Sequence, residues 1–498
     1  MGFRSLLSKP FARHVVKKQQ QWMKNPLAAQ DKILNEIVST AKSTKFGQDH
    51  SFSSIRTHAD FKSLVPVRDY ELLSPYINEI LKGTPDILWP GKPEYFAKTS
   101  GTTSGTKYIP ITKASIPNHI NSARDALLNY VHETGQSQFL DGNLIFLSGS
   151  PILNQTAGIN TGRLSGIVNH HVPSYLRSNQ MPTYETNCIE DWEDKVDKIV
   201  EETLAKNMTL ISGIPPWVQM YFDKIQEKTG KPIKDVFPNF SLFVHGGVNF
   251  EPYKAKLFDT IGKPVDSIET YPASEGFIAF QDKQDTEGLL LLLNSGIFYE
   301  FIPADEYFDE NPTRLNISEA KTGVNYAVII NSNAGLWGYS IGDTVKFVST
   351  NPYRIVVSGR IKHFISAFGE HVIGEEVEKA MNHAVSLFPE TEIVEFTVAP
   401  QVTPESGLPR HEWYVEFGQA PSDFPSFSQA INTKLQKLNS YYDDLITGNI
   451  LEELKIVPLQ KGAFINHMKS LGKLGGQNKV PRLSNDRKIA ESLMKFKI

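Results

Sequence analysis

Short apolar segments that end in glycine turns alternate with longer amphipathic segments along this chain, and this alternation restricts the possible fold more than any other feature. "NLIFLSGSP" (143–151) and "LFVHGGVNF" (242–250) predict buried strands that run into glycine turns. "EDWEDKVDKIVEETLAKN" (190–207) and "PPWVQMYFDKIQEKTG" (215–230) predict helices, because their apolar residues recur at helical spacing. Strands that alternate with helices predict an α/β fold.

A second, smaller domain is indicated by a change of pattern near residue 350. Strands broken by Gly and Asn-Pro turns fill 339–365, followed by a helix at 374–388, strands at 392–400 and 411–418, a helix from about 426 to 441, and a basic tail. With 498 residues, the chain is too long for one ordinary core. We therefore predict a large domain of mixed sheets flanked by helices over 1–358, and a small α/β domain over 359–498.

The first sixty or so residues are expected to be helical, and a turn-rich region is expected to follow them. "LAAQDKILNEIVSTAKST" (27–44) has helical periodicity, and another helix is expected after Pro75, ending at Gly83. "MGFRSLLSKPFARHVVKKQQ" (1–20) contains no acidic residue. That composition is typical of a transit peptide and also of an amphipathic surface helix, and we favour the helix.

Composition excludes several classes of protein. The net charge of −4 gives no reason to expect a nucleic-acid partner. The single cysteine, Cys188, forms no intramolecular disulfide and suits a reducing compartment, so we expect a cytoplasmic protein. No apolar run reaches the length that spans a bilayer, and no membrane partner is expected.

The stretch "KTSGTTSGTKYIPIT" (98–112) surrounds one lysine with glycines and hydroxyl groups, an inventory that suits a polyphosphate. It is not a Walker A loop, because only three residues separate Gly101 from Gly105 and Tyr108 stands where Ser or Thr is needed. "HGG" (245–247) resembles an esterase oxyanion loop, but the G-x-S-x-G nucleophile motif is absent. A zinc site of the H-E-x-x-H type is absent as well.

Four further stretches contain glycines and functional side chains that could act together with this loop. "VHGGVNF" (244–250) offers bare backbone to a flat ring, and "ETYPASEGFIAF" (269–280) puts an aromatic ring, a hydroxyl and a carboxylate close together. "GYSIGDTVKF" (338–347) presents Asp343 at the start of a strand, and "SGRIKHFISAFGEHVIGEEVE" (358–378) opens the small domain.

In this order the motifs resemble those of the adenylate-forming superfamily, which includes acyl-CoA ligases, firefly luciferase and peptide-synthetase adenylation domains. The last motif matches from Gly359 to Glu378 and departs at Ser366 and Gly374, where many members carry Lys and Pro. Within the superfamily, "FKSLVPVRDYELLSPYINEILKG" (61–83), "YPASEG" (271–276) and "GQNKVPRL" (476–483) resemble the auxin-responsive acyl acid amido synthetases of plants and their bacterial relatives. This resemblance spans about residues 55–485.

The resemblance implies an ATP- and Mg²⁺-dependent ligase that adenylates a carboxylic acid and then transfers the acyl group to an amine, usually of an amino acid. The β- and γ-phosphates would be held by Ser100, Gly101, Thr102, Thr103 and Lys107. The adenine would lie against Gly246, Gly247, Val248 and Tyr271, and Ser274 would contact the α-phosphate. The remaining implied roles are Mg²⁺ binding by Glu275, ribose binding by Asp343, ribose or phosphate contact by Arg360, the domain hinge at Lys362, and transition-state stabilisation by Lys479.

Two other functions stay open on the sequence alone. An acyl-CoA ligase shares the first half-reaction and the same hinge motif. A non-catalytic nucleotide-binding protein could share the fold, but the presence of Glu275, Asp343, Lys362 and Lys479 argues against it. No motif identifies the acyl acid, the acceptor amine or the oligomeric state.

Overall fold

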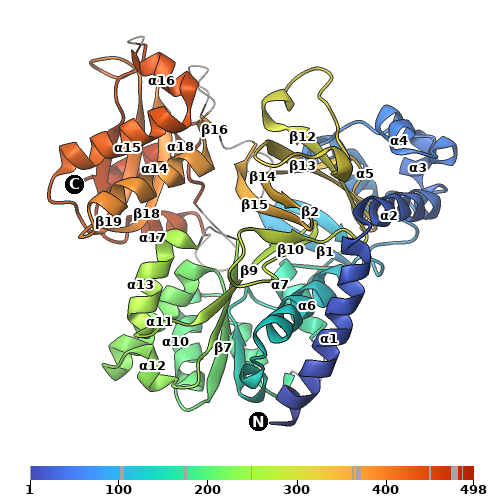
Figure 1. The fold of residues 1–498 in the computed structure, drawn as a ribbon, viewed down its shortest axis with the longest axis horizontal. Helices are drawn as coiled ribbons and strands as arrows, with labels where there is room; N and C mark the ends of the chain where they lie inside the picture. Colours follow the sequence, from blue (N-terminus) through green and yellow to red (C-terminus); the bar gives the residue numbers. More distant parts are fainter. Residues whose placement is uncertain are drawn as a thin grey trace. The chain divides into compact units, whose positions relative to one another are not determined.

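The computed structural model describes residues 2–100, 106–172, 177–247, 250–361, 364–365, 372–447, 450–472, 480–484 and 486–498. They form two compact units (Figure 1). The larger unit holds the described residues up to Ile341 together with Val345–Val356, and the smaller one holds Gly342–Thr344 and most of the chain from Val357 onward. This division lies close to the domain boundary predicted at Gly359. That the boundary separates two mobile bodies stays a prediction.

An eleven-stranded mixed sheet runs through the larger unit in the order β12-β13-β14-β15-β11-β10-β9-β8-β7-β3-β6. Its strands are β3 (Asn143–Phe146), β6 (Gln180–Met181), β7 (Met208–Ser212), β8 (Leu242–Gly246), β9 (Asp266–Ala273), β10 (Gly276–Phe280), β11 (Leu289–Leu291), β12 (Ile297–Pro303), β13 (Asn325–Ser332), β14 (Tyr339–Thr350) and β15 (Tyr353–Arg360). Strands β6, β3, β7, β8 and β9 pair in parallel, whereas β10 returns antiparallel to β9.

A four-stranded sheet of order β2-β1-β5-β4 lies in the same unit. Its strands are β1 (Tyr95–Ser100), β2 (Thr106–Ile111), β4 (Asn154–Thr156) and β5 (Ile159–Gly162).

Helices cover both sides of the long sheet, with α10, α11 and α13 on one side of β7 and β9 and with α6 and α1 on the other (Figure 1). The helices of this unit are α1 (Phe3–Met23), α2 (Pro26–Ala41), α3 (Lys45–Asp49), α4 (His58–Leu64), α5 (Tyr70–Leu81), α6 (Ile116–Thr134), α7 (Leu164–His170), α9 (Tyr184–Asn187), α10 (Trp192–Thr203), α11 (Pro215–Thr229), α12 (Ile233–Val236) and α13 (Glu251–Ile261). The predicted α/β fold is confirmed, as are the strands and helices expected at 143–151, 190–207, 215–230 and 242–250.

Local chemistry sets the helix boundaries. The Asp191 side chain accepts a hydrogen bond from the Asp194 N–H and so begins α10, and α11 begins with Pro215 and ends at Gly230, where φ is +67°. The expectation that a helix begins after Pro75 is wrong: α5 begins at Tyr70, because the Asp69 side chain caps it by accepting from the Leu72 N–H at 3.1 Å.

The smaller unit packs helices against a three-stranded sheet of order β18-β19-β20. Its elements are β16 (Phe364–Ile365), β17 (Val372–Ile373), α14 (Gly374–Leu387), β18 (Glu392–Gln401), β19 (Arg410–Gln419), α15 (Phe424–Leu438), α16 (Ser440–Thr447), β20 (Lys455–Leu459), α17 (Ala463–Ser470) and α18 (Lys488–Leu493). The predicted order from α14 to α15 is confirmed, but the expected basic tail contains most of α16 together with β20, α17 and α18. Strand β20 contains Pro458, which an edge strand tolerates because its outer side needs no N–H donor.

Among the described residues, no helix is long and apolar enough to cross a bilayer.

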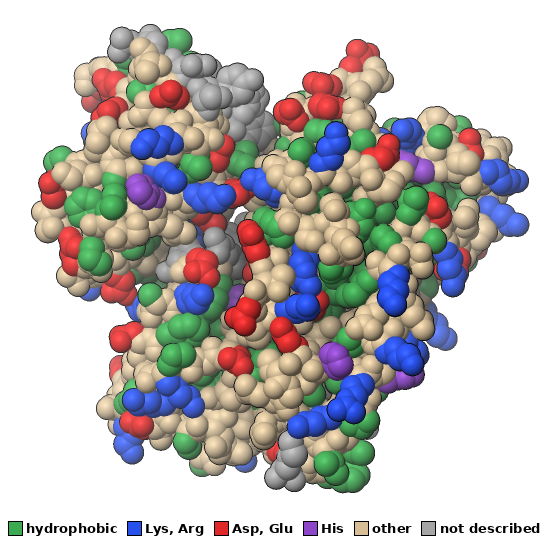
Figure 2. All heavy atoms as spheres, in the orientation of Figure 1, with side chains coloured by type: hydrophobic (Ala, Val, Ile, Leu, Met, Phe, Trp, Pro, Cys, Tyr) green, Lys and Arg blue, Asp and Glu red, His purple; other side chains and the backbone are tan. Residues whose placement is uncertain are grey.

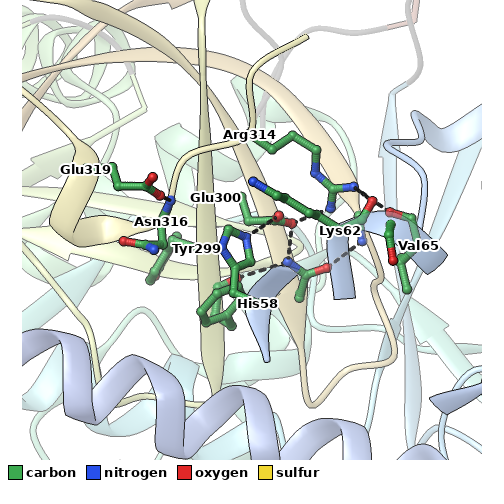
Figure 3. A network of polar contacts seen from close by, with 12 residues as sticks. His58, Lys62, Val65, Tyr299, Glu300, Arg314, Asn316 and Glu319 are labelled. Atoms are coloured by element: carbon green, nitrogen blue, oxygen red, sulfur yellow. Dashed lines mark hydrogen bonds and ion pairs between the residues drawn. The ribbon is translucent and has the colours of Figure 1, made fainter. Parts of the chain in front are cut away.

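A buried ion-pair network ties α4 to the sheet (Figure 3). Glu300 on β12 is fully buried, and its carboxylate lies 2.8 Å from His58 Nε2 and accepts from Arg314 Nη2 at 2.6 Å and Asn331 Nδ2 at 3.0 Å. Arg314 Nη1 in turn donates to the Val65 carbonyl at 2.5 Å. Burial alone would raise the pKa of Glu300, but the contact with His58 and the charge of Arg314 outweigh it and lower that pKa.

This network also fixes the start of β14. The Asn331 Oδ1 accepts from the Gly338 N–H at 2.6 Å, and the backbone of Arg68 bonds to Gly338 and Ser340 on either side of Tyr339. These hydrogen bonds therefore hold the chain in place at the start of β14, the strand that carries Asp343. It begins at Tyr339, the first residue of the predicted strand region, so Asp343 lies inside the strand and not at its start as predicted.

We predict that Arg314→Met lowers the free energy of unfolding at neutral pH by about 3–5 kcal/mol, because it leaves the buried Glu300 carboxylate without its cation. The pKa of Glu300 is depressed in the folded state, so its contribution is present above the ordinary carboxyl pKa and is lost as the pH falls. The destabilisation measured by urea unfolding should therefore shrink towards acidic pH. Lys198→Ala removes the exposed Lys198–Glu201 pair and is expected to leave the free energy of unfolding almost unchanged. Equal losses in the two variants would contradict the assignment.

Candidate active site

The glycine turn predicted after β8 is present. Its first residue must be glycine because strand β9 lies too close for a side chain. A Cβ on Gly246 would lie 2.3 Å from the carbonyl oxygen of Thr270, its register partner on β9. Thr270 Oγ1 donates to the His245 carbonyl at 2.9 Å, a second contact between β9 and the end of β8. Gly247 follows in the left-handed region with φ of +84°, which favours glycine. The carboxyl end of β8 is therefore bare backbone, against which a flat ring can lie.

Ser274 and Glu275 lie on a turn, as the sequence predicts, whereas Tyr271 lies on the strand β9 before it and not on the same turn. Tyr271 follows Thr270 on β9 and is buried, whereas Ser274 and Glu275 form the two-residue turn between β9 and β10 and are half-buried. Because β8 and β9 are parallel, their carboxyl ends meet at one edge of the sheet. The glycine turn and the tyrosine are thus adjacent.

Asn118 on α6 holds the other side of this hairpin, and sequence reasoning missed it. Its Oδ1 accepts from the Phe277 N–H at 2.6 Å, and its Nδ2 donates to the Phe277 carbonyl at 3.1 Å. Asn118 is buried, so both backbone groups of Phe277 depend on this one amide. No spacing rule could have found it, because the partner lies 159 residues further along the chain.

The Ser/Thr/Gly loop joins two antiparallel strands. Thr99 pairs with Lys107, and Ser100 pairs with Thr106. The Lys107 Nζ lies 5.5 Å from the Tyr70 ring centroid, and the Tyr70 hydroxyl accepts from the Tyr108 N–H at 2.9 Å. Strand β2 leads directly into α6, so the element that follows Lys107 also carries Asn118.

Asp343 and Arg360, which the sequence assigns to the ribose and the phosphates, form an ion pair. Arg360 Nε donates to Asp343 Oδ1 at 2.6 Å, and half of the Arg360 side chain is exposed. The Ile361 N–H donates to the Gly342 carbonyl at 2.7 Å, which fixes the two chain segments next to each other. An exposed pair of this kind contributes little to the free energy of folding, so breaking it would cost little.

Two ionisable groups, the buried His245 and the half-buried Glu269, flank the β8–β9 edge. Burial, with the nearby charge of Glu251, raises the pKa of Glu269 to about 7. Burial also lowers the pKa of His245 to about 3, so its ring is neutral at physiological pH. Neither group carried a recognisable signal in the sequence.

Beside β2 lies an apolar cavity of about 10 Å³, room for one water at most. It is lined by Ile111, Ile116, His119, Ile120, Leu164, Ile167, Val168 and His171. His119 is buried, and burial lowers its pKa to about 4. In the part of the chain that the structure describes, its ring has no hydrogen-bond partner.

Six predicted site residues fall wholly outside the described residues: Gly101, Thr102, Thr103, Val248, Lys362 and Lys479. The side chain of Ser100 is not described either. Within the described ranges, no three His, Cys, Asp or Glu side chains cluster as a metal site. Glu275 alone still suits Mg²⁺, which proteins commonly bind through one or two carboxylates together with substrate phosphates.

The fold defines the class of protein. A solved structure of 2-hydroxyisobutyryl-CoA ligase in the postadenylation state matches with a TM-score of 0.61 at 12% identity, covering 96% of this chain and 92% of that one. The solved GH3.15 acyl acid amido synthetase matches with a TM-score of 0.81 at 16% identity, covering 97% and 96%. The architecture is that of the adenylate-forming enzymes, as predicted.

The chain belongs to the GH3 family. Residues 15–265 match the GH3 family N-terminal domain, 290–360 the central domain and 375–488 the C-terminal domain. A jasmonoyl–L-amino acid synthetase of Oryza sativa subsp. japonica is 24% identical over 92% of both chains. The predicted family is confirmed, and with it the class of ATP-dependent ligase that forms an amide bond.

We predict that Asn118→Ala slows adenylation about ten- to a hundredfold and raises the Mg²⁺ concentration for half-maximal rate, because the Ser274–Glu275 turn loses its support. The readout is acid-dependent pyrophosphate release against Mg²⁺ concentration. Asn129→Ala is the matched control: Asn129 is a buried asparagine on the same helix, and its Nδ2 donates to Gln19 Oε1 at 2.9 Å, away from the hairpin. If both variants lose stability and neither shifts the Mg²⁺ dependence, Asn118 does not position the turn.

Proposed function

We propose that this protein joins a carboxylic acid to the amine of an amino acid through an acyl adenylate. The carboxylate attacks the α-phosphorus of ATP and releases pyrophosphate, and the amine then attacks the acyl carbon and releases AMP. The observation that carries this proposal is the edge at which the bare backbone of Gly246, the buried Tyr271 and the Ser274–Glu275 turn come together. This edge offers a face for a base next to a hydroxyl and a carboxylate.

In this proposal the nucleotide lies along the carboxyl ends of β8 and β9. Adenine rests against Gly246, Gly247 and Val248 and against the Tyr271 ring, and Ser274 donates to the α-phosphate. The loop that contains Ser100, Gly101, Thr102 and Thr103 encloses the β- and γ-phosphates together with Lys107. Asp343 exchanges its contact with Arg360 for the two ribose hydroxyls, and the released guanidinium lies near the ribose or the phosphates.

Glu275 is proposed to hold Mg²⁺ between its carboxylate and the phosphates. Bound there, the ion neutralises charge that develops on the phosphate oxygens. The resemblance assigns the hinge to Lys362 and transition-state stabilisation to Lys479, and both roles stay predictions. A lysine delivered by a small domain would complete the site only when adenylation is due.

The acyl group is proposed to lie near α6 and α7, where Ile116, Ile120 and Ile167 meet beside the end of β2. This apolar lining suits the hydrocarbon body of an acid, and the cavity must widen to admit one. An amino acid acceptor is favoured over CoA because the rice relative, which aligns over 92% of this chain, is a jasmonoyl–L-amino acid synthetase. The single cysteine supports placing the enzyme in the cytoplasm.

The direct test is pyrophosphate release from Mg-ATP over a panel of aryl, indolyl and aliphatic acids, with mixed amino acids or CoA added in parallel. Release with one acid, and faster AMP formation when amino acids are present, is the expected result. Acceleration by CoA alone would assign the protein to the acyl-CoA ligases instead. ATP binding without pyrophosphate release for any acid would contradict the adenylation step.

Lys479→Ala is expected to lower the rate of adenylation about a hundredfold or more while the Kd for ATP changes little, because the lysine acts mainly on the transition state. Single-turnover pyrophosphate release and calorimetric ATP binding measure the two quantities separately. Lys488→Ala, at an exposed lysine of the same C-terminal segment, is the control. A parallel loss of ATP affinity in Lys479→Ala would make Lys479 a binding residue only.

Glu275→Ala is expected to raise the Mg²⁺ requirement of adenylation at least tenfold, because the ion loses its protein carboxylate. The measurement is a Mg²⁺ titration of pyrophosphate release at saturating ATP. An unchanged titration midpoint would remove Glu275 from the metal site.

A further inference from the structure

The first half of helix α1 buries its small side chains and exposes its large ones, whereas the second half buries Val15, Val16 and Trp22. Ser5, Ser8 and Ala12 face the body of the protein, where α1 packs on α6. Phe3, Leu6, Leu7 and Phe11 are instead 76%, 60%, 51% and 43% exposed. A helix that only had to pack on this domain would have the reverse arrangement.

The exposed apolar residues form one stripe. Positions 3, 6, 7, 10 and 11 follow the spacing that places side chains on a single helix face. In Figure 2, hydrophobic side chains gather at the lower end of the molecule, near the N-terminus of α1, and Lys and Arg side chains lie above them along the helix.

Polar contacts fix the rotation of α1 about its axis, so the stripe cannot turn inward. Asp141 accepts from the Gly2 N–H at 2.6 Å and from the Ser5 N–H at 3.2 Å, and Ser5 Oγ donates to the Ser137 carbonyl at 2.7 Å. At the other end of the helix, Gln19 accepts from the buried Asn129. Turning the apolar face towards the body would break these buried hydrogen bonds.

The charge of the same segment is of one sign. Residues 2–30 contain Arg4, Lys9, Arg13, Lys17, Lys18 and Lys24 and no Asp or Glu. Arg13, Lys17 and Lys18 are exposed, and none of them forms an ion pair within the described part of the chain. Two acids lie beside α1: Asp141 is engaged by backbone N–H groups of the helix, and Asp125, next to Gln19, pairs with Arg124.

We propose that α1 binds the surface of an anionic membrane, with Phe3, Leu6 and Leu7 entering the interfacial layer and Arg13, Lys17 and Lys18 lying among the lipid headgroups. An apolar stripe beside a cationic surface without acidic residues is the combination that interfacial helices use. A second copy of this chain is a poorer occupant, because pairing α1 with α1 would bring like charges together. The sequence led us to expect no membrane partner because no segment can span a bilayer, but surface binding needs no spanning segment.

The test is flotation of the full chain with vesicles of phosphatidylcholine alone and of phosphatidylcholine mixed with phosphatidylserine, at low and high salt. Three double variants accompany the unaltered chain: Leu6→Ser with Leu7→Ser, Lys17→Glu with Lys18→Glu, and the control Leu72→Ser with Leu387→Ser. Leu72 and Leu387 are 62% and 56% exposed on other helices, so the control removes the same side chains at similar exposure. Thermal unfolding verifies that every variant folds.

The expected result is binding to the phosphatidylserine vesicles that weakens as salt rises, because screening shortens the reach of the charges. Each α1 variant should bind these vesicles about tenfold less, and the control variant should bind like the unaltered chain. The proposal is overturned by no binding at low salt, by equal binding in all variants, or by a dimer that Leu6→Ser with Leu7→Ser abolishes. The amide-forming activity is not used as a readout, so this result is independent of the proposed function.

Discussion

The parallel pairing of β8 with β9 is the contact on which the candidate site depends. It brings the two carboxyl ends to one edge, and the closeness of Thr270 to Gly246 excludes any side chain there. The strand β9 then continues into Tyr271 and the two-residue turn with Ser274 and Glu275. The register between β8 and β9 thus places the bare backbone of Gly246 next to Tyr271 and the turn that follows it.

Helix α6 connects this edge to the Ser/Thr/Gly hairpin. It begins just after β2, which carries Lys107, and the Asn118 amide holds both backbone groups of Phe277. Near the other end of the long sheet, the Glu300 network and the Arg68 backbone fix the segment just before β14. Strand β14 carries Asp343. Contacts between residues far apart in the sequence therefore hold both of these segments.

Local patterns predicted most of the elements, because strand and helix periodicity depend on neighbouring residues. The segments 143–151 and 242–250 became β3 and β8, and 215–230 became α11 between its proline and its glycine. The errors have equally local causes: the Asp69 cap starts α5 before Pro75, and β20 was missed because Pro458 is unusual in a strand. The roles of Lys362, Lys479 and the loop at 101–105 rest on resemblance, since these residues lie outside the described ranges.

The sequence by itself determined the order of elements, the family and the residue types of the site, because motifs and periodicity are properties of short segments. Only the tertiary structure decided that Asn118 supports the hairpin, that Glu300 is neutralised by Arg314, and that Asp343 pairs with Arg360. It also decided that α1 turns Leu6 and Leu7 outward, because the contacts of Ser5 and Gln19 set its rotation. Each of these depends on groups brought together from distant parts of the chain, where sequence periodicity carries no information.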